Sequence, residues 1–257
     1  MSEASAILAL AHRDFIKLLR DRQRIVADFA FPLIFIGILG TSLQAGFGNQ
    51  AGSLNLLDYV FTGVLAQTVW QSSALGLISL LADREQDFSQ EIFVSPISRY
   101  SIILGKILGE SLVALPQALG IIAFGFILQI HMGPDQLARM ALAMLVIALF
   151  GGAFGVIVLA NLSSQRAANQ IFPFVMLPQF FLAGVFNPVM NLPLPLEILS
   201  KLSPMRYAVD VMRDIFYPSG SGIALTDLST NLAIIGVEFV LFMVIGTAGF
   251  VRAERNR

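Results

Sequence analysis

Few side chains in this sequence are of the types that carry out chemistry. The 257 residues include two histidines, His12 and His131, and no cysteine. The absence of cysteine excludes thiolate metal sites and cysteine nucleophiles. Two histidines are too few for most histidine-based metal sites, and they make a catalytic triad improbable. Gly105-Lys106 is followed by Ile107 and lacks the upstream glycine of a phosphate-binding loop, so we expect no ATP site in this chain. His-Glu-x-x-His and Gly-x-Ser-x-Gly elements are also absent from the sequence.

Charged side chains within apolar stretches are the remaining candidates. A charge at the centre of a membrane-spanning helix costs about 2.5–3.5 kcal/mol on insertion scales, so each one needs a reason. Lys106 and Glu110 stand four residues apart and are expected to form a structural pair. Glu238 has no partner close in sequence and is the one candidate for a substrate or proton site. An ion pair with Arg206 or Arg213 is the alternative for Glu238.

The composition places these side chains in a membrane protein. Hydrophobic residues make up 56% of the chain and charged residues 13%, against about 25% charged residues in globular domains. The net charge of -1 gives no indication of nucleic acid as a partner. Six apolar blocks reach or approach the roughly 20 residues with which a helix crosses a membrane. They are Ile25–Leu43, Val60–Leu81, Ile102–Ile130, Leu137–Leu159, Ile171–Phe186 and Leu232–Val251.

The blocks are continuous rather than alternating, which favours helices over a barrel. We therefore expect one all-α integral membrane domain (1–257) with six transmembrane helices. With the N-terminus inside, 12 of the 16 Lys and Arg residues lie on the cytoplasmic side, so both termini are predicted to be cytoplasmic. The predicted segments are an amphipathic interface helix (1–24), spans 1 and 2 (25–81), a cytoplasmic loop (82–99), spans 3 to 5 (100–186), an extracellular region (187–228), and span 6 with a cytoplasmic tail (229–257).

The N-terminal segment is predicted to be an amphipathic helix rather than a cleaved signal peptide. Ile7, Ala11 and Phe15 repeat at helical spacing, while Arg13 and Lys17 lie on another face. Such a helix lies along the inner headgroup surface and anchors the first span in membrane lipid. Framing the docking site of a cytoplasmic partner is the alternative role.

The loop between the second and third blocks combines charges with apolar side chains. Phe88, Ile92 and Phe93 recur at helical spacing, and Pro96 disfavours helix at Ser95. A short surface helix of this kind suits a partner's cleft, which would bury the apolar groups and pair the acids. Packing on the membrane surface is the alternative. The docking candidates are Asp83, Arg84, Glu85, Asp87, Phe88, Glu91, Ile92 and Phe93.

Polar and small residues within the blocks indicate a path and a packing contact. Gln67, Trp70 and Gln71 are candidates to line a substrate path, although a buried tryptophan is the more common explanation for Trp70. Gly151 and Gly155 form a Gly-x-x-x-Gly element that lets helices approach closely, and we expect that contact within one subunit. The fifth block is predicted to be a kinked helix rich in aromatic residues, because two prolines interrupt it. Its phenylalanines are Phe174, Phe180, Phe181 and Phe186.

The region from 187 to 228 is predicted to re-enter the membrane from outside. Five prolines prevent a continuous spanning helix, yet its leucines make it too apolar for a free loop. Arg206 and Arg213, with Asp210 and Asp214, recur three to four residues apart along the chain and can pair on a short helix. These residues shape an exit gate or, alternatively, an ion-paired external cap.

Two motifs in these places resemble a known family, the permease subunits of type 2 ATP-binding-cassette exporters. The first lies in the loop after the second span and consists of Arg84-Glu85, Ile92, Val94–Arg99 and Leu104–Lys106. The second is similar to the outer-face signature of the family and consists of Phe181–Pro188, Leu202–Tyr207 and Arg213. The resemblance extends over nearly the whole chain and has both motifs in order.

The resemblance implies a fold and partners. The helix from about Asp83 to Phe93 corresponds to the coupling helix, which docks on a separate ATP-binding-cassette ATPase subunit, and ATP and Mg are then held by that subunit. A second permease copy, identical or homologous, completes the transporter in the cell inner membrane. The phenylalanines of the fifth helix correspond to a gate beside the dimer interface. The residues matching the extracellular motif are Asn187, Pro188, Pro204, Arg206, Tyr207 and Arg213.

The predicted function is that of a transport subunit without enzymatic activity of its own. With 1 Trp and 4 Tyr against 21 Phe, the chain suits export of a hydrophobic or amphiphilic substrate, such as a drug-like, lipid or lipid-linked molecule. Export of a polysaccharide is a lesser alternative. The competing class is an ion-coupled secondary transporter with Glu110 and Glu238 as relay carboxylates. A membrane scaffold and an intramembrane enzyme come last.

Overall fold

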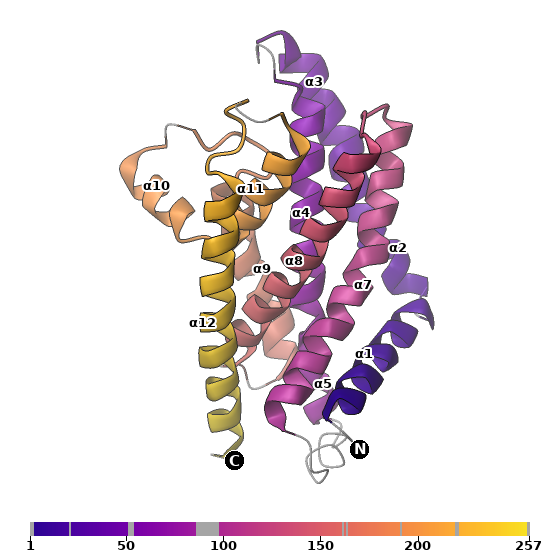
Figure 1. Cartoon of the computed structure of the whole chain (residues 1–257), viewed down its shortest axis with the longest axis vertical. Helices are drawn as coiled ribbons and strands as arrows, with labels where there is room; N and C mark the ends of the chain where they lie inside the picture. Colours follow the sequence, from indigo (N-terminus) through magenta and orange to yellow (C-terminus); the bar gives the residue numbers. More distant parts are fainter. Residues whose placement is uncertain are drawn as a thin grey trace.

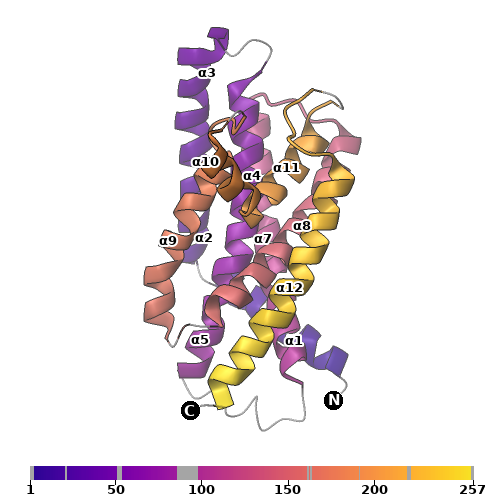
Figure 2. The ribbon, with the colours of Figure 1, turned by 90° about the vertical axis from the view of Figure 1, so that its left-hand side faces the viewer.

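The computed structural model describes residues 3–20, 22–50, 54–85, 98–160, 162, 164–190, 192–218 and 221–255. Within these ranges every regular element is a helix and none is a strand, which confirms the predicted all-α class. Most helices run along the long axis of an elongated bundle, and the short helices α10 and α11 lie near one end of it (Figure 1, Figure 2). In chain order the elements are α1 (Glu3–Arg20), α2 (Arg22–Ile34), the π-helical η1 (Phe35–Gly40), α3 (Thr41–Phe47), the 3₁₀ segment η2 (Gly48–Gln50), α4 (Leu56–Gly76), α5 (Ile78–Glu85), α7 (Arg99–Ile127), α8 (Pro134–Leu159), α9 (Gln165–Leu182), α10 (Leu194–Lys201), α11 (Pro204–Phe216) and α12 (Leu228–Arg255).

Side-chain caps fix where several long helices begin. Asn55 Oδ1 accepts hydrogen bonds from the backbone N–H groups of Leu57 and Asp58 at the start of α4. Ser98 and Ser164 cap α7 and α9 in the same way. Such caps satisfy backbone donors that a helix leaves unpaired at its first turn.

Five helical stretches of the described residues are long and apolar enough to cross a membrane. They are Asp28–Phe47, Leu56–Ala82, Tyr100–Ile127, Pro134–Leu159 and Leu228–Phe250. Each contains or overlaps one of the predicted blocks, so five of the six predicted spans are supported. The prediction succeeds there because the thickness of the hydrocarbon layer sets the number of apolar residues that a spanning helix needs.

The fifth predicted block differs from the structure in its bounds and its character. Helix α9 begins at Gln165, ahead of the predicted Ile171, and ends at Leu182, so the expected span to Phe186 was wrong at its end. Gly184 adopts φ +69°, a left-handed conformation that suits glycine and terminates the helix. Polar residues in the first two turns and two internal prolines explain why α9 lacks the sustained apolar stretch of the other five.

Helix α4 forms the centre of the bundle and is buried along nearly its whole length. It packs against α7, α8, α11 and η1. A Cβ atom at Gly151 of α8 would lie 2.1 Å from the Trp70 carbonyl oxygen of α4, and one at Gly155 would lie 2.6 Å from the Ala74 carbonyl oxygen. The Gly-x-x-x-Gly element thus sets the α4–α8 contact, which confirms its predicted role inside one subunit.

Helix α1 packs along α7, and its own Ala11 is buried. Figure 1 places α1 at the same end of the bundle as the end of α12, the end of α5 and the start of α7. The segment that joins α5 to α7, from 86 to 97, lies outside the described residues. Five of the residues predicted to dock on a partner belong to it, namely Asp87, Phe88, Glu91, Ile92 and Phe93, while Asp83, Arg84 and Glu85 form the last turn of α5.

Candidate functional site

Polar side chains from three helices line a small cavity in this otherwise apolar bundle. The cavity has a volume of about 120 Å³ and a second one beside it a volume of about 300 Å³. We call the two together the polar groove, because both are lined by Asp28, Ser72 and Leu75. The polar residues of its walls are Asp28 of α2, Gln67, Thr68, Gln71 and Ser72 of α4, Ser79 of α5, Gln117 of α7, and Gln165 and Asn169 of α9.

Two amide contacts organise one wall of the polar groove. Gln117 Nε2 donates to Asp28 Oδ2 at 2.7 Å, and Gln67 Nε2 donates to Gln71 Oε1 at 2.6 Å. Other polar atoms of the same walls have no hydrogen-bond partner among the described residues, namely Gln67 Oε1, Thr68 Oγ1, Ser72 Oγ and Gln117 Oε1. A buried polar atom without a partner is costly, so these atoms are available to a polar group of a bound molecule.

The structure separates the three residues that the sequence proposed for a path. Gln67 and Gln71 lie in the polar groove. Trp70 is fully buried in the core on another side of α4, where its ring lies 4.6 Å from that of Phe154. Asp28 and Gln117 are contributors that sequence reasoning missed, because they lie 89 residues apart and only the packing of α2 on α7 brings them together.

An aromatic cluster continues from the polar groove to Phe186, beyond the end of α9. Phe31 lines the groove and its ring lies 4.2 Å from that of Phe35. The ring of Phe35 stacks on that of Phe186 at 5.0 Å. Phe180 and Phe181 each lie 6.5 Å from Phe186. Three of the four phenylalanines predicted for a gate thus gather in one place, while Phe174 is 80% exposed elsewhere on α9.

The arginines of the predicted extracellular motif are buried in a built structure. Arg206 Nη1 donates at 2.7 Å to Ser200 Oγ, which itself donates to the Leu182 carbonyl oxygen at the end of α9. Arg213 Nη2 donates at 2.6 Å to the Gly184 carbonyl oxygen, and its guanidinium lies 3.7 Å from the centre of the Tyr59 ring. Burial lowers the pKa of Arg213.

The remaining motif residues hold or flank this structure. Tyr207 Oη donates at 2.6 Å to the Lys201 carbonyl oxygen, and burial is the main cause that raises the pKa of Tyr207. Pro204 begins α11. Asn187 and Pro188 are exposed. The motif therefore joins α9, α10 and α11 into one unit, which we call the outer cap.

The predicted ion pairs within α11 were wrong. Among the described residues neither Arg206 nor Arg213 forms an ion pair with Asp210 or Asp214, and neither pairs with Glu238. Asp210 instead accepts hydrogen bonds from the backbone N–H groups of Leu225 at 2.7 Å and Thr226 at 2.8 Å, and from Asn231 Nδ2 at 2.9 Å. Arg206 donates to the Ser200 hydroxyl of α10 and Arg213 to the Gly184 carbonyl after α9, because these are the acceptors that the buried side of α11 meets.

The two candidate relay carboxylates belong to separate places. Glu238 lines a cavity of about 640 Å³ along α12, and its Oε2 has no partner among the described residues. Glu110 lies in the interior of α7 and pairs with Lys106 at 3.4 Å, as the sequence predicted. No group of three or more His, Asp or Glu side chains in the described ranges is arranged to hold a metal ion.

Comparison with known proteins agrees with this architecture. The family model of the ABC-2 type transporter matches residues 5–217. A protein of Cyanophora paradoxa named as a transport permease, ycf38, is 26% identical over 95% of this chain and 86% of its own length. A protein of Escherichia coli (strain K12) named as a multidrug ABC transporter permease, YbhR, is 29% identical over 56% of this chain and 39% of its own length. Nodulation protein J of Rhizobium meliloti is 25% identical over 76% of this chain and 74% of its own length. Since the family model covers well over half of the sequence, the chain is a multi-pass membrane protein that belongs to the ABC-2 type transporter family.

Proposed function

We propose that this chain is the permease subunit of an ATP-driven exporter that moves a hydrophobic or amphiphilic molecule out of the cytoplasm or the inner leaflet. The observation that carries the proposal is the polar groove, whose unpartnered amide and hydroxyl atoms lie within membrane-spanning helices and adjoin the aromatic cluster. The polar head of an amphiphile suits the polar groove, and its apolar body suits the aromatic cluster. The name of the Escherichia coli relative, a multidrug permease, supports the same class.

The transport cycle that we infer needs two further kinds of subunit. A second permease copy, identical or homologous, faces the first, and an ABC ATPase subunit docks on each copy at the segment from Asp83 to Phe93. ATP and Mg are bound by the ATPase, and this chain supplies no cofactor. Closure of the ATPase subunits pushes on the docking segments and shifts the helices from an inward-open to an outward-releasing arrangement.

The topology that we propose has six crossings in the cell inner membrane. The shared end of α1, α5, α7 and α12 faces the cytoplasm, in agreement with the excess of basic residues predicted there. Helix α9 is the fifth of these crossings, and the polar residues of its first turns are tolerated because they adjoin the polar groove. The outer cap re-enters the outer leaflet. The position of Trp70 in the core leaves no Trp platform in the described groove, which favours an amphiphile over a polysaccharide.

Replacing Gln71 by leucine tests the polar groove as the binding site. The change removes the acceptor of Gln67 and one amide from the groove, so transport of an amphiphile with a hydrogen-bonding head is expected to fall about tenfold, the equivalent of about 1.4 kcal/mol. Transport by the reconstituted complex is measured for such a probe and for a purely apolar probe, whose rate should stay within twofold. The control Trp70→Phe lies outside the groove and should not alter the ratio of the two rates. An equal loss of transport rate for both probes in Gln71→Leu would refute the polar groove as the site that binds the polar head.

Combining Phe88→Ala with Glu91→Lys tests the docking segment. The pair removes one apolar anchor and reverses one charge, so binding of the ATPase subunit is expected to fall at least tenfold while membrane insertion is unchanged. The matched control combines Phe47→Ala with Glu197→Lys, two exposed residues near the other end of the bundle, and should bind normally. Affinity is measured by titrating labelled ATPase onto the solubilised permease. Normal binding by the first variant would place the docking surface elsewhere.

A further inference from the structure

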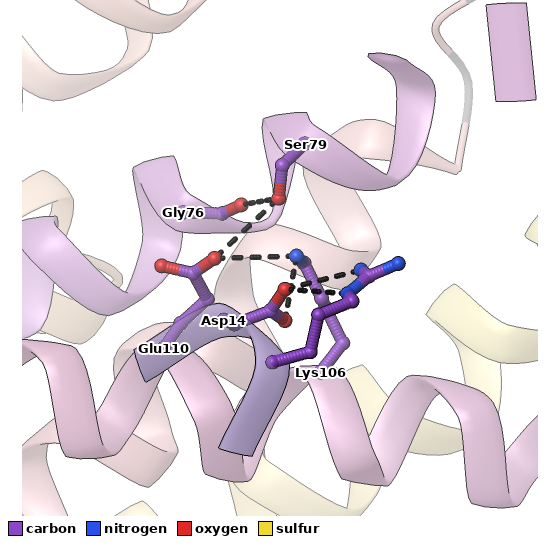
Figure 3. A network of polar contacts seen from close by, with 6 residues as sticks. Asp14, Gly76, Ser79, Lys106 and Glu110 are labelled. Atoms are coloured by element: carbon purple, nitrogen blue, oxygen red, sulfur yellow. Dashed lines mark hydrogen bonds and ion pairs between the residues drawn. The ribbon is translucent and has the colours of Figure 1, made fainter. Parts of the chain in front are cut away.

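Three buried charges of alternating sign lie between α1 and α7, at the end of the bundle that carries the chain termini. Lys106 Nζ lies 2.7 Å from Asp14 Oδ2 and 3.4 Å from Glu110 Oε1. The Ser79 hydroxyl of α5 lies 3.4 Å from Glu110 Oε1 and shares its proton between that carboxylate and the Gly76 carbonyl oxygen. Figure 3 shows Asp14 and Glu110 reaching Lys106, and Ser79 reaching Glu110 and Gly76. We call Asp14, Lys106, Glu110 and Ser79 the ionic cluster.

The ionic cluster is shielded from solvent, which makes its geometry exacting. Asp14, Lys106 and Glu110 are 4%, 2% and 2% exposed. Among the described contacts, Arg13 at the edge also pairs with Asp14, at 3.0 Å, so that Asp14 faces two cations. Removal of charges from water is costly unless each is held close to a partner. Helices α1 and α7, which carry these charges, are therefore held in one mutual arrangement.

Glycines allow the helices to approach closely at this place. A Cβ atom at Gly76 would lie 1.9 Å from Glu110 Oε2, so the end of α4 leaves room for that carboxylate. A Cβ atom at Gly105 would lie 3.2 Å from Ile7 Cα, and one at Gly109 would lie 3.0 Å from Ala11 Cα. The two glycines of α7 thus allow α1 to pack closely against α7 beside Lys106.

The position of the ionic cluster in the chain gives it a mechanical role. Ser79 belongs to α5, which ends at Glu85, and Lys106 belongs to α7, which begins at Arg99. These two helices flank the segment from 86 to 97, on which the ATPase subunit is proposed to dock. A push on that segment reaches α5 and α7 first, and the contact of Lys106 with Asp14 passes it to α1.

We propose that Asp14, Lys106 and Glu110 are positioning residues that join α1, α5 and α7 into one unit, so that movement of the ATPase subunit is transmitted to the interface helix and the spans together. The inference rests on the proposed function and goes beyond it, because it assigns the step from docking to helix movement to a particular set of side chains. Without the ionic cluster, α1 moves relative to α7, and part of the movement of the ATPase subunit no longer reaches the spans. ATP hydrolysis then continues while less substrate is moved.

The test measures substrate molecules transported per ATP hydrolysed in liposomes that contain the complete complex. Lys106→Met and Asp14→Asn are each expected to lower this ratio at least fivefold, while ATPase binding and basal hydrolysis stay within twofold of wild type. Lys106→Arg keeps the cation and should retain at least half of the ratio. If these residues served only to stabilise the fold, the variants would lower the yield of folded complex. The folded complex would then still transport as many substrate molecules per ATP as the wild type.

A reversible disulfide between α1 and α7 tests whether Lys106 acts by holding the two helices together or through another effect of its charge. The chain has no native cysteine, and a Cβ atom at Gly105 would lie 3.3 Å from Leu10 Cβ, close to the 3.5–4.5 Å range of disulfides. In the Lys106→Met background, Leu10→Cys with Gly105→Cys should restore at least half of the ratio under oxidation and lose it on reduction. A wild-type ratio in both Lys106→Met and Asp14→Asn would overturn the inference, as would a lowered ratio that the disulfide does not restore. If the wild-type chain itself binds no ATPase and transports nothing, the proposed function fails instead.

Discussion

Replacement of Gly151 by valine is expected to lower the Tm of the solubilised protein by about 6–12 °C. A Cβ atom at this position would lie 2.1 Å from the Trp70 carbonyl oxygen and 2.9 Å from Trp70 Cα, so the obstruction is backbone that cannot rotate away. Helices α4 and α8 must then separate, which also loosens the contact of Trp70 with Phe154. Overpacking at the upper end of its usual range costs about 3 kcal/mol, and each kcal/mol changes the Tm of a chain of this size by about 2–4 °C.

The control for this variant is Gly236→Val on α12. An added Cβ atom at Gly236 meets no atom within 4 Å, and this face of α12 is exposed in the single chain. Its Tm should stay within about 2 °C of wild type, since only helix propensity changes. Thermal unfolding of both variants is followed under identical detergent conditions. Equal Tm values for the two would mean that α8 does not depend on close contact with α4.

The parts of the fold that the sequence predicted are those set by a single physical requirement. Five spans were found because hydrocarbon thickness dictates the length of an apolar helix, whatever its neighbours. The Gly-x-x-x-Gly contact of Gly151 and Gly155 was found because only small residues permit such an approach. The end of α9 was misplaced because apolar residues continue through the turn at Gly184, where the backbone conformation, not hydropathy, stops the helix.

The candidate site was only half visible in the sequence, for a different reason. Gln67 and Gln71 could be identified because a polar residue within a span needs an explanation. Asp28 and Gln117 could not be linked to them, since their contact depends on the rotation of α2 and α7 about their own axes. The partners of Arg206 and Arg213 were missed because spacing along α11 shows which side chains are close and does not show which side of the helix is buried. Lys106 and Glu110 were paired correctly, but Asp14, 92 residues away from Lys106, was outside the reach of the spacing argument.

Replacement of Asp210 by asparagine is expected to loosen the connection between α11 and α12. The buried carboxylate accepts hydrogen bonds from the backbone N–H groups of Leu225 and Thr226 and from the Asn231 amide. An asparagine has one acceptor oxygen, so its NH₂ group faces a donor, and the nearby charge of Arg213 loses its compensation. Charge-assisted hydrogen bonds of this kind contribute about 1.5–3 kcal/mol each, so a loss of about 3 kcal/mol and a Tm lowered by about 6–12 °C are expected.

Asp214→Asn is the matched control, because it makes the same chemical change one turn further along α11 and is not expected to lower the Tm. The pKa of Asp214 is raised, chiefly by burial and further by the charges of Asp210 and Asp227, which outweigh the lowering effect of a hydrogen bond from the Leu228 backbone N–H. A raised carboxyl pKa means that the fold disfavours the charged form, so the charge at this position opposes folding at neutral pH. Its removal should leave the Tm unchanged or raise it slightly. Hydrogen exchange at the Leu225 and Thr226 amides gives the local readout. It should accelerate at least tenfold in Asp210→Asn and stay at the wild-type rate in Asp214→Asn, whereas unchanged exchange in both would show that Asp210 does not hold this segment.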